Sequence, residues 1–380
     1  MRKKIAVVFG TRPEAIKCAP VIQELRKRSE LFEVIIIATA QHREILDQVL
    51  KVFGIEVDVD LNLMRENQPL EELTSRLIDS LSKIFKEHVF DYIFVQGDTT
   101  TTFITSLAAF YNKIPVCHIE AGLRTFNKYS PFPEEMNRQL TTILADLHFS
   151  PTFTATNNLL LMGIEREKIF LTGNTVIDAL YYISCKFNFN NKRDEQRDEK
   201  FVLITAHRRE SFGEPIKNIC RGIKTLVAKH KEIYAFFPVH PNPNIKDIVY
   251  KELGGIDRVN LLPPLSYLEF VKLMHKVDII LTDSGGVQEE APFFHKPVIV
   301  LRDTSERMEG VKAGCLKIAG THSERIVEET MRLLTDDKYY KDMSNVKNPF
   351  GDGKASERIV SALSWSCGFG EKPKEFEAKY

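Results

Sequence analysis

Three carboxylates lie in short polar segments that follow apolar runs, where a catalytic side chain would be accessible. Asp98 stands in a Gly-Asp-Thr-Thr segment, Glu120 follows the apolar run 116–119, and Glu134 follows two closely spaced prolines. Carboxylates that converge repel one another, which favours protonated forms near neutral pH and suits general acid and base catalysis. Two other roles stay open at this point. One is Mg²⁺ binding, although these segments contain no Asp-x-Asp pair, and the other is helix capping by Asp98, Glu134 or Glu135.

A second group of residues could hold a phosphate without an excess of cations. An Asp-Ser-Gly-Gly turn follows an apolar run and opens a helical pattern, so the region of Ser284, Gly285 and Gly286 is a candidate diphosphate cradle. Glu290 lies four residues after Gly286, on the same helix face, where it could accept hydrogen bonds from ribose hydroxyls. Arg12 precedes a proline at an expected helix start, which favours an anion there. No Gly-x-Gly-x-x-Gly follows a predicted strand, so the sequence does not predict NAD binding.

An alternation of strands and helices would position both groups. The predicted strands are 5–9, 34–38, 92–95, 116–119, 147–149 and 169–171, then 202–205, 234–238, 260–262, 279–281, 298–301 and 316–318. Most are continuously apolar, as parallel strands covered on both faces require. The helical stretches between them include 15–27, 70–86 and 213–229. The pattern predicts an α/β protein with two doubly wound sheets, whose ligands bind outside the carboxyl ends of the strands.

The domain junction is predicted between Thr172 and Lys200. Residues 190–200 form the only long charged run, between a helical stretch and a strongly apolar strand. We therefore assign 1–172 to an N-terminal domain and 173–354 to a C-terminal domain. The final helical stretch, 355–365, could cover either domain.

Composition excludes several classes of protein. The 380 residues contain 52 Lys and Arg and 52 Asp and Glu, so the net charge is zero and lacks the cation excess of a nucleic-acid binder. No apolar run approaches the roughly 18 residues of a membrane span, and the first residues do not form a signal peptide. We therefore expect a cytoplasmic protein. The six cysteines are scattered, which predicts reduced thiols rather than disulfides or a zinc site.

Nine segments, in order along the chain, resemble the non-hydrolysing UDP-N-acetylglucosamine 2-epimerases. They are GTRPEAIK, AQHREILDQVL, GDTTTT, HIEAGLRT, PFPEEMNRQ, TGNTVIDAL, TAHRRES, DSGGVQEEAP and NPFGDGKAS, which run from residue 10 to residue 356. The resemblance implies a glycosyltransferase-B architecture: two Rossmann-like domains facing across a cleft, with a C-terminal helix at about 355–380 crossing back to the first. It also implies a homodimer that interconverts UDP-GlcNAc and UDP-ManNAc without NAD or a dedicated metal.

The resemblance also assigns roles to the residues singled out above. It implies that Asp98, Glu120 and Glu134 are the acid and base groups. It implies that UDP is held by Arg12, His207 and the turn of Ser284, Gly285 and Gly286, with Glu290 at the ribose. His207 is also implied to be catalytic. The reaction would eliminate UDP to give 2-acetamidoglucal and then add it back, supplying ManNAc units for cell-surface polysaccharide.

Some family members are activated by a second UDP-GlcNAc molecule beside the active site. The residues implied for such a site are Gln41, His42, Gln68, Arg208 and His240. Glu44 and Asn67 depart from the family's pattern there and alter two polar contacts, so strong activation is not predicted.

Three alternatives compete with this reading. A hydrolysing epimerase would release free ManNAc and UDP, although the segment PFPEEMNR argues against it. A glycosyltransferase of the same fold would bind a UDP-sugar but would also need an acceptor groove. A nucleotide-sugar sensor without catalytic activity would not need three carboxylates at one edge of a sheet.

Overall fold

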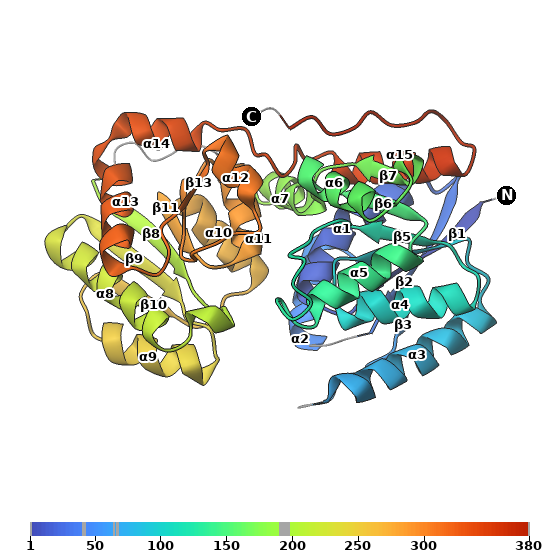
Figure 1. The fold of residues 1–380 in the computed structure, drawn as a ribbon, viewed down its shortest axis with the longest axis horizontal. Coiled ribbons are helices and arrows are strands. Elements are labelled where there is room, and N and C mark those ends of the chain that lie inside the picture. The colour runs from blue at the N-terminus through green and yellow to red at the C-terminus, as the bar shows by residue number, and fades with distance from the viewer. Residues whose placement is uncertain (1, 40–42, 64, 66–67, 190–197, 379–380) are drawn as a thin grey trace. The chain divides into compact units, whose positions relative to one another are not determined.

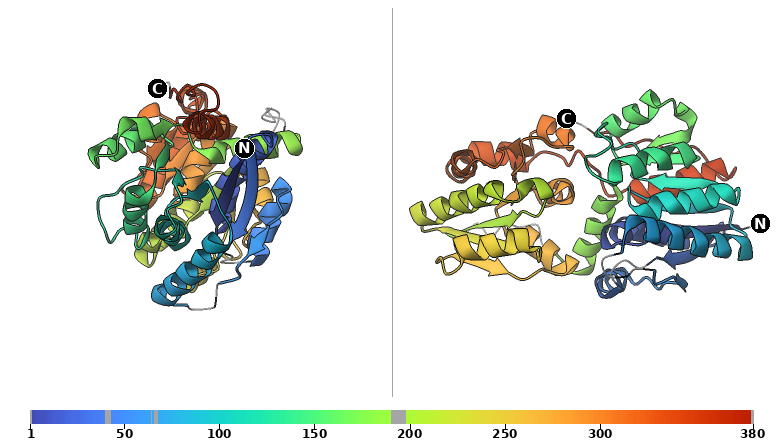
Figure 2. Two further views of the ribbon diagram at one scale, coloured as in Figure 1. Left: turned by 90° about the vertical axis from the view of Figure 1, so that its right-hand side faces the viewer. Right: turned by 60° about the horizontal axis from the view of Figure 1, so that its bottom comes forward.

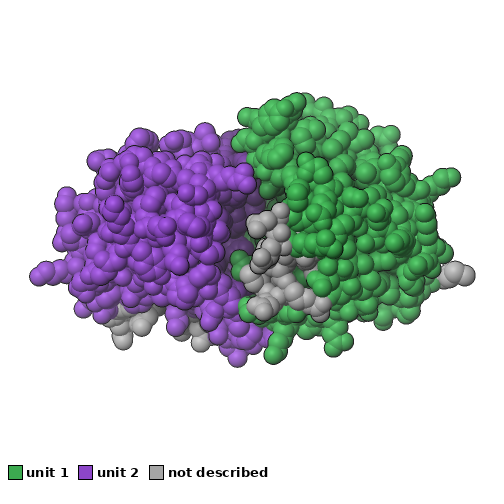
Figure 3. Space-filling view, turned by 90° about the horizontal axis from the view of Figure 1, so that it is seen from below, with its two compact units in different colours: residues 1–183, 350–378 green, residues 184–349, 379–380 purple. Residues whose placement is uncertain are grey.

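The computed structural model describes residues 2–39, 43–63, 65, 68–189 and 198–378. These residues form two compact units (Figure 3). Unit 1 contains the described residues up to Ile183 together with Phe350–Ala378, and unit 2 is Ser184–Pro349. The chain passes from unit 1 to unit 2 inside one helix and returns at Phe350. Within the described residues, no helix is both long enough and apolar enough to cross a membrane.

Each unit is built on one fully parallel sheet (Figure 1). The strands of unit 1 are β1 (Lys3–Phe9), β2 (Phe32–Ala38), β3 (Val59–Asp60), β4 (Tyr92–Gln96), β5 (Val116–Ile119), β6 (Leu147–Ser150) and β7 (Ile169–Leu171), in the order β3-β2-β1-β4-β5-β6-β7. The strands of unit 2 are β8 (Lys200–Thr205), β9 (Ile233–Pro238), β10 (Val259–Leu262), β11 (Ile279–Thr282), β12 (Val298–Val300) and β13 (Leu316–Ile318), in the order β10-β9-β8-β11-β12-β13. Both orders reverse direction at the first strand of the unit, as in doubly wound folds, so the predicted fold class is confirmed.

Helices connect successive strands and cover the sheets (Figure 2). Those of unit 1 are α1 (Arg12–Lys27), α2 (Arg43–Phe53), α3 (Leu70–Glu87), α4 (Thr100–Tyr111), α5 (Glu134–Leu144), α6 (Phe153–Leu161) and α15 (Ala355–Ser366). Those of unit 2 are α8 (Glu214–Lys229), α9 (Pro243–Leu253), α10 (Tyr267–Lys276), α11 (Gly285–Glu290), α12 (Met308–Ala313), α13 (Ser323–Thr335) and α14 (Asp337–Ser344). Helix α7 (Thr175–Lys186) contains the point at which the chain passes between units.

The sheet of unit 1 packs a different core on each face. On one face, Ala6 and Val8 of β1 join a buried cluster with α3 and α4. On the other, the rings of Phe94, Phe149 and Phe170 lie side by side, with 6.0 Å between successive centroids. Such aromatic contacts stabilise beyond the area they bury, so they help to fix the register of the sheet.

The C-terminal helix α15 completes unit 1. Its Trp365 packs edge-on against Phe170 of β7, again at 6.0 Å. The carboxylate of Asp178, in α7, accepts the backbone N–H groups of Ala355 (3.1 Å) and Ser356 (2.7 Å), which are the first two of the helix. A carboxylate at this position satisfies N–H groups that have no partner within the helix.

Two expectations about elements were wrong. The C-terminal helix, which the resemblance implied to extend to about 380, ends at Ser366, close to the end of the predicted stretch 355–365. Gly368, directly after the C-cap, takes a left-handed backbone conformation (φ +80°) that ends it. The segment that follows is not helical, and the N–H of Phe376 donates to the Leu171 carbonyl at 2.8 Å. The edge strand β3 was not predicted, because it is two residues long and only partly buried.

Gly122 should be sensitive to a methyl group for a steric reason. Its φ is +94°, and a Cβ would stand 2.2 Å from the Ala155 carbonyl oxygen of α6. We expect Gly122→Ala to lower the free energy of unfolding by about 1–2 kcal/mol from backbone strain and by about 1–3 kcal/mol more from overlap. Urea denaturation would measure both.

Gly163 is the matched control for this substitution. Its φ is +82°, and a Cβ there would meet nothing within 4 Å, so Gly163→Ala should show the strain alone. Equal destabilisation by the two variants would contradict the steric explanation.

Candidate functional site

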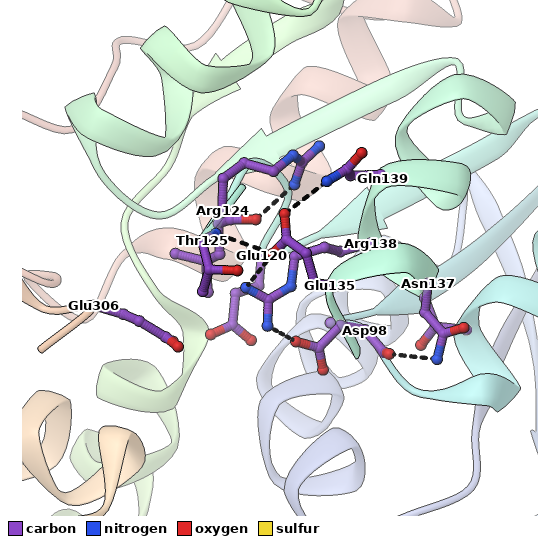
Figure 4. A network of polar contacts seen from close by, with 12 residues as sticks. Asp98, Glu120, Arg124, Thr125, Glu135, Asn137, Arg138, Gln139 and Glu306 are labelled. Atoms are coloured by element: carbon purple, nitrogen blue, oxygen red, sulfur yellow. Dashed lines mark hydrogen bonds and ion pairs between the residues drawn. The ribbon is translucent and has the colours of Figure 1, made fainter. Parts of the chain in front are cut away.

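Asp98 lies in the turn between β4 and α4, at the carboxyl edge of the sheet of unit 1 (Figure 4). It does not cap α4. The N-cap is Thr99, whose hydroxyl accepts the N–H of Thr102 at 3.1 Å. The capping explanation for Asp98 is therefore wrong. The Asp98 side chain is available for contacts outside α4.

The carboxylate of Asp98 forms an ion pair with a buried arginine. The Nη2 atom of Arg138, in α5, lies 2.5 Å from Oδ2 of Asp98, and the two side chains are 6% and 29% exposed. The neighbouring Asn137 donates from Nδ2 to the Asp98 backbone carbonyl at 3.0 Å. Both the charge and the main chain of Asp98 are thus held by one helix.

Glu120 comes directly after β5 and takes a left-handed backbone conformation (φ +63°). Its side chain is 6% exposed and contacts Lys17 of α1, whose Nζ lies 2.6 Å from Oε1 and 2.7 Å from Oε2. Gln96 and Asn174 also donate side-chain N–H groups to the carboxylate. A buried carboxylate is tolerated only with such partners.

The sequence led us to expect three carboxylates that repel one another, but two of them are paired with a cation. Arg138 pairs with Asp98 and also, at 3.5 Å, with Glu135, and Lys17 pairs with Glu120. Both cations lie within segments already singled out, GTRPEAIK and PFPEEMNRQ. A basic residue on an otherwise buried helix face was the signal that could have identified them.

The first two residues of α5 differ in their surroundings. Glu135 is fully buried and accepts the backbone N–H groups of Thr125 (3.0 Å) and Phe126 (3.2 Å). Burial raises the pKa of Glu135, but the hydrogen bonds from Thr125 and Gln139 and the charge of Arg138 outweigh burial and lower it. Helix capping was the structural role considered for Glu135. Its role is structural, but it holds the loop at Thr125 and Phe126 rather than capping the helix.

Glu134 is the first residue of α5 and is partly buried. Its Oε2 atom is shielded from solvent and has no hydrogen-bond partner among the described residues. The N-cap of α5 is Pro133, which makes no side-chain capping bond. Glu134 is therefore the member of the predicted acid and base set for which no neutralising cation is found in the described part of the chain.

Arg12 is exposed and is the first residue of α1, as the sequence predicted. The helix start is held by Glu14, whose carboxylate accepts the N–H groups of Gly10 (3.0 Å) and Thr11 (2.7 Å) and the hydroxyl of Thr99 (2.6 Å). Burial raises the pKa of Glu14, and these hydrogen bonds oppose that shift. Glu14, which sequence reasoning passed over, thus ties the start of α1 to the start of α4.

Two buried histidines lie on the strands behind the carboxylates. His118 of β5 and His148 of β6 are opposite each other in the sheet, and both are fully buried. The Nε2 atom of His118 lies 2.7 Å from the Gly97 carbonyl oxygen, so this nitrogen carries the proton. Burial lowers the pKa of His118 to about 4 and that of His148 to about 3. Both rings are therefore neutral at pH 7.

In unit 2, the turn after β11 carries a buried carboxylate that positions the turn after β8. Oδ2 of Asp283 accepts the N–H groups of His207 (2.7 Å) and Arg208 (2.8 Å) and the Ser211 hydroxyl (2.8 Å). The Nδ1 atom of His207 lies 3.4 Å from Oδ1 of Asp283, and its ring stacks on that of His240 with centroids 5.5 Å apart.

The glycine turn of unit 2 lies against two guanidinium groups. A Cβ on Gly285 would stand 3.4 Å from the guanidinium of Arg307 and 3.7 Å from that of Arg208. Arg307, which the sequence reasoning missed, is held by Glu289 through an Nε–Oε1 contact of 2.7 Å. Ser284 occupies the N-cap position of α11, but its hydroxyl makes no capping bond. Backbone N–H groups next to two guanidinium groups suit a diphosphate.

The remaining predicted residues are divided among several places. Gly286 and Glu290 lie in α11, and Glu290 is buried. Arg208 and His240 lie beside the proposed UDP-binding residues Gly285 and His207. Gln68 precedes α3 in unit 1 and accepts the N–H of Arg65 at 3.2 Å. Gln41, His42 and Asn67 lie outside the described residues.

The protein is a two-domain α/β protein of the glycosyltransferase-B type, with one of the two groups of residues in each domain. Its solved structural neighbours share this fold. The chain belongs to the UDP-N-acetylglucosamine 2-epimerase family, because the family model with that description matches residues 23–364. The family resemblance inferred from the sequence is thereby confirmed.

Known proteins of this family cover nearly the whole chain. UDP-N-acetylglucosamine 2-epimerase from Bacillus subtilis is 50% identical over 377 residues, which is 99% of each chain. The Neisseria meningitidis UDP-GlcNAc 2-epimerase structure bound to UDP-GlcNAc is 49% identical, has a TM-score of 0.88, and matches 95% of this chain and 99% of that one. The S. aureus MnaA–UDP co-structure is 46% identical, with a TM-score of 0.90, and matches 99% of this chain and 100% of that one.

Lys17 should be required for stability because it neutralises a buried charge. The Lys17→Met variant leaves the Glu120 carboxylate without its cation and should lower the free energy of unfolding by about 3–5 kcal/mol. The double variant Lys17→Met/Glu120→Gln removes both charges and should recover most of that loss, as measured by urea denaturation. A double variant no more stable than Lys17→Met would show that the ion pair is not the source of the effect.

The buried histidines should make the protein less stable in mild acid. Their pKa values in the folded protein lie below the ordinary value of 6.5, so the unfolded chain binds protons first as the pH falls. The stability they contribute is complete above pH 6.5 and is lost as the pH falls towards about 4 for His118 and about 3 for His148. Between pH 7 and pH 5 we expect each histidine to reduce the free energy of unfolding by about 2 kcal/mol.

The variant His148→Leu should weaken this dependence when urea denaturation is compared at the two pH values. His88, which is exposed, supplies the control, and His88→Gln should leave the dependence unchanged. An unaltered pH dependence in His148→Leu would exclude His148 as one of its sources.

Proposed function

We propose that this protein catalyses the reversible epimerisation of UDP-GlcNAc at C2 to give UDP-ManNAc. The observation that carries the proposal comes from unit 1 of a chain of this family. Asp98 and Glu120 follow neighbouring strands of the sheet, and Glu134 begins the helix α5 whose Arg138 pairs with Asp98. Unit 2 supports it with a glycine turn and two guanidinium groups suited to a diphosphate. Further support comes from the relatives, one of which was solved bound to UDP-GlcNAc and another with UDP.

The chemistry of the substrate favours elimination over direct deprotonation. The C2 hydrogen has no adjacent carbonyl, so its removal would leave an unstabilised carbanion. If the C1–O bond to UDP breaks as a base takes the proton, the electron pair of the C–H bond forms a C1–C2 double bond. The products are 2-acetamidoglucal, UDP and a protonated base. Return of a proton to the opposite face of C2, with re-formation of the C1–O bond, gives the epimer.

This route assigns different tasks to the two groups of residues. Asp98, Glu120 and Glu134 are proposed to exchange protons with the sugar. His207 and the turn of Ser284, Gly285 and Gly286, all in unit 2, are proposed to hold UDP and stabilise the negative charge that develops on it. Arg12 of unit 1 is proposed for the same task. Glu290 is proposed to bind the ribose. Because the sugar is never oxidised, the proposed route requires no NAD. The proposal that it also needs no dedicated metal rests on the family resemblance.

Several finer parts of the proposal rest on the family resemblance. The enzyme is proposed to retain the sugar rather than release free ManNAc, to act as a homodimer, and to supply ManNAc units for cell-surface polysaccharide. Arg208, His240, Gln68, Gln41 and His42 are proposed for a second UDP-GlcNAc site. The positions of Arg208 and His240 beside Gly285 and His207 support such a site next to the first.

Incubation with UDP-GlcNAc in D₂O, followed by NMR, tests the proposal. We expect deuterium at C2 of both UDP-GlcNAc and UDP-ManNAc, because the proton that returns comes from solvent. Heat-inactivated protein is the control for non-enzymatic exchange. Free ManNAc with UDP would indicate the hydrolysing alternative. An absence of turnover would reject epimerase activity and leave the glycosyltransferase or the sensor.

A further inference from the structure

The turn that carries Asp98 is held by three side chains from two different elements. His118 of β5 donates from Nε2 to the Gly97 carbonyl at 2.7 Å, and Asn137 of α5 donates to the Asp98 carbonyl at 3.0 Å. Arg138, also in α5, contacts the Asp98 carboxylate at 2.5 Å. Two consecutive peptide groups and the side chain are therefore fixed, which leaves Asp98 little freedom to reorient.

Helix α5 also carries Glu134, one turn before Arg138. Residues at i and i+4 lie on the same face of a helix, so Glu134 and the guanidinium that holds Asp98 share one side of α5. The start of this helix is itself anchored, because buried Glu135 accepts the N–H groups of Thr125 and Phe126. Glu135 thus ties the first turn of α5, which includes Glu134, to the loop at Thr125 and Phe126.

We propose that the first two turns of α5 set the spacing between Asp98 and Glu134, and that Arg138 is the positioning residue that transmits this spacing to Asp98. The inference rests on the proposed epimerase function, in which carboxylates act on opposite faces of the same carbon. Proton transfer depends steeply on the distance between donor and acceptor, so two groups joined to one helix keep a fixed separation through the catalytic cycle. All of the contacts involved lie within unit 1.

A double-mutant cycle separates this role from a general contribution to folding. If Arg138 acts through Asp98, its loss should matter only while the Asp98 carboxylate is present. Arg138→Met should lower kcat about 100-fold and leave the KM for UDP-GlcNAc within about 3-fold. Asp98→Asn should lower kcat by about 10²–10⁴-fold. The double variant should be no slower than Asp98→Asn alone, within about 3-fold.

Two further variants complete the design. Arg138→Lys keeps a positive charge but not the guanidinium fork, and it should recover part of the activity lost in Arg138→Met. If Arg138→Met proves insoluble, Arg138→Lys can replace it in the double-mutant cycle with Asp98→Asn. Arg28→Met is the matched control, because Arg28 also binds a carboxylate and hydroxyls in unit 1 but lies at the opposite end of α1 from Arg12. Its kcat should be unchanged.

The possible failures are distinguishable. Turnover of the unaltered protein is measured first, and its absence would reject the proposed function itself. With turnover present, losses that multiply in the double variant would show that Arg138 does not act through Asp98 and would overturn the inference. A rise in KM with no change in kcat would also overturn it. UDP affinity, measured by calorimetry, should be the same in all variants, because most residues proposed to hold UDP lie in unit 2.

Discussion

The structure of the candidate site depends on the burial of a negative charge at the end of a strand. Glu120 follows an interior strand of unit 1, and its side chain is almost completely enclosed. An isolated carboxylate in such surroundings is strongly unfavourable, so the surrounding elements must supply a cation and hydrogen-bond donors. They come from α1, from β4 and from the segment before α7, as Lys17, Gln96 and Asn174. One charge thus constrains three parts of the fold that are distant in sequence.

The same arrangement recurs elsewhere in the molecule. Asp98 is neutralised by Arg138, and Asp283 of unit 2 is buried beneath N–H groups of the turn that carries His207. In each case an acidic residue just after a strand binds donors from another part of its unit. The zero net charge of the chain is consistent with such local pairing, because a protein can bind an anionic substrate through backbone N–H groups and a few placed cations. Total charge excludes some partners, whereas the placement of individual charges determines the chemistry.

The fold was predictable from the sequence to a greater extent than the site. Apolar runs such as 279–281 and 298–301 fall on β11 and β12, because burial on both faces leaves a continuous hydrophobic signal. The carboxylates were found because they follow such runs. Lys17, Arg138 and Arg307 were missed because a basic residue in a helix or loop is most often solvated, and its partner is set by tertiary packing. Glycines at Gly368 and Gly370 were visible in the sequence, yet their left-handed conformations appear only in the structure.

The packing of α15 determines the order in which the protein can be completed during synthesis. Trp365 covers Phe170, and Asp178 satisfies the first N–H groups of the helix, so unit 1 lacks part of its core until residue 366 is available. Unit 2, by contrast, ends at Pro349. Although the N-terminal part of a chain usually folds first on the ribosome, here the unit that begins first is finished last. The nascent chain must therefore keep an unfinished face of its first sheet from aggregating while all of unit 2 is made.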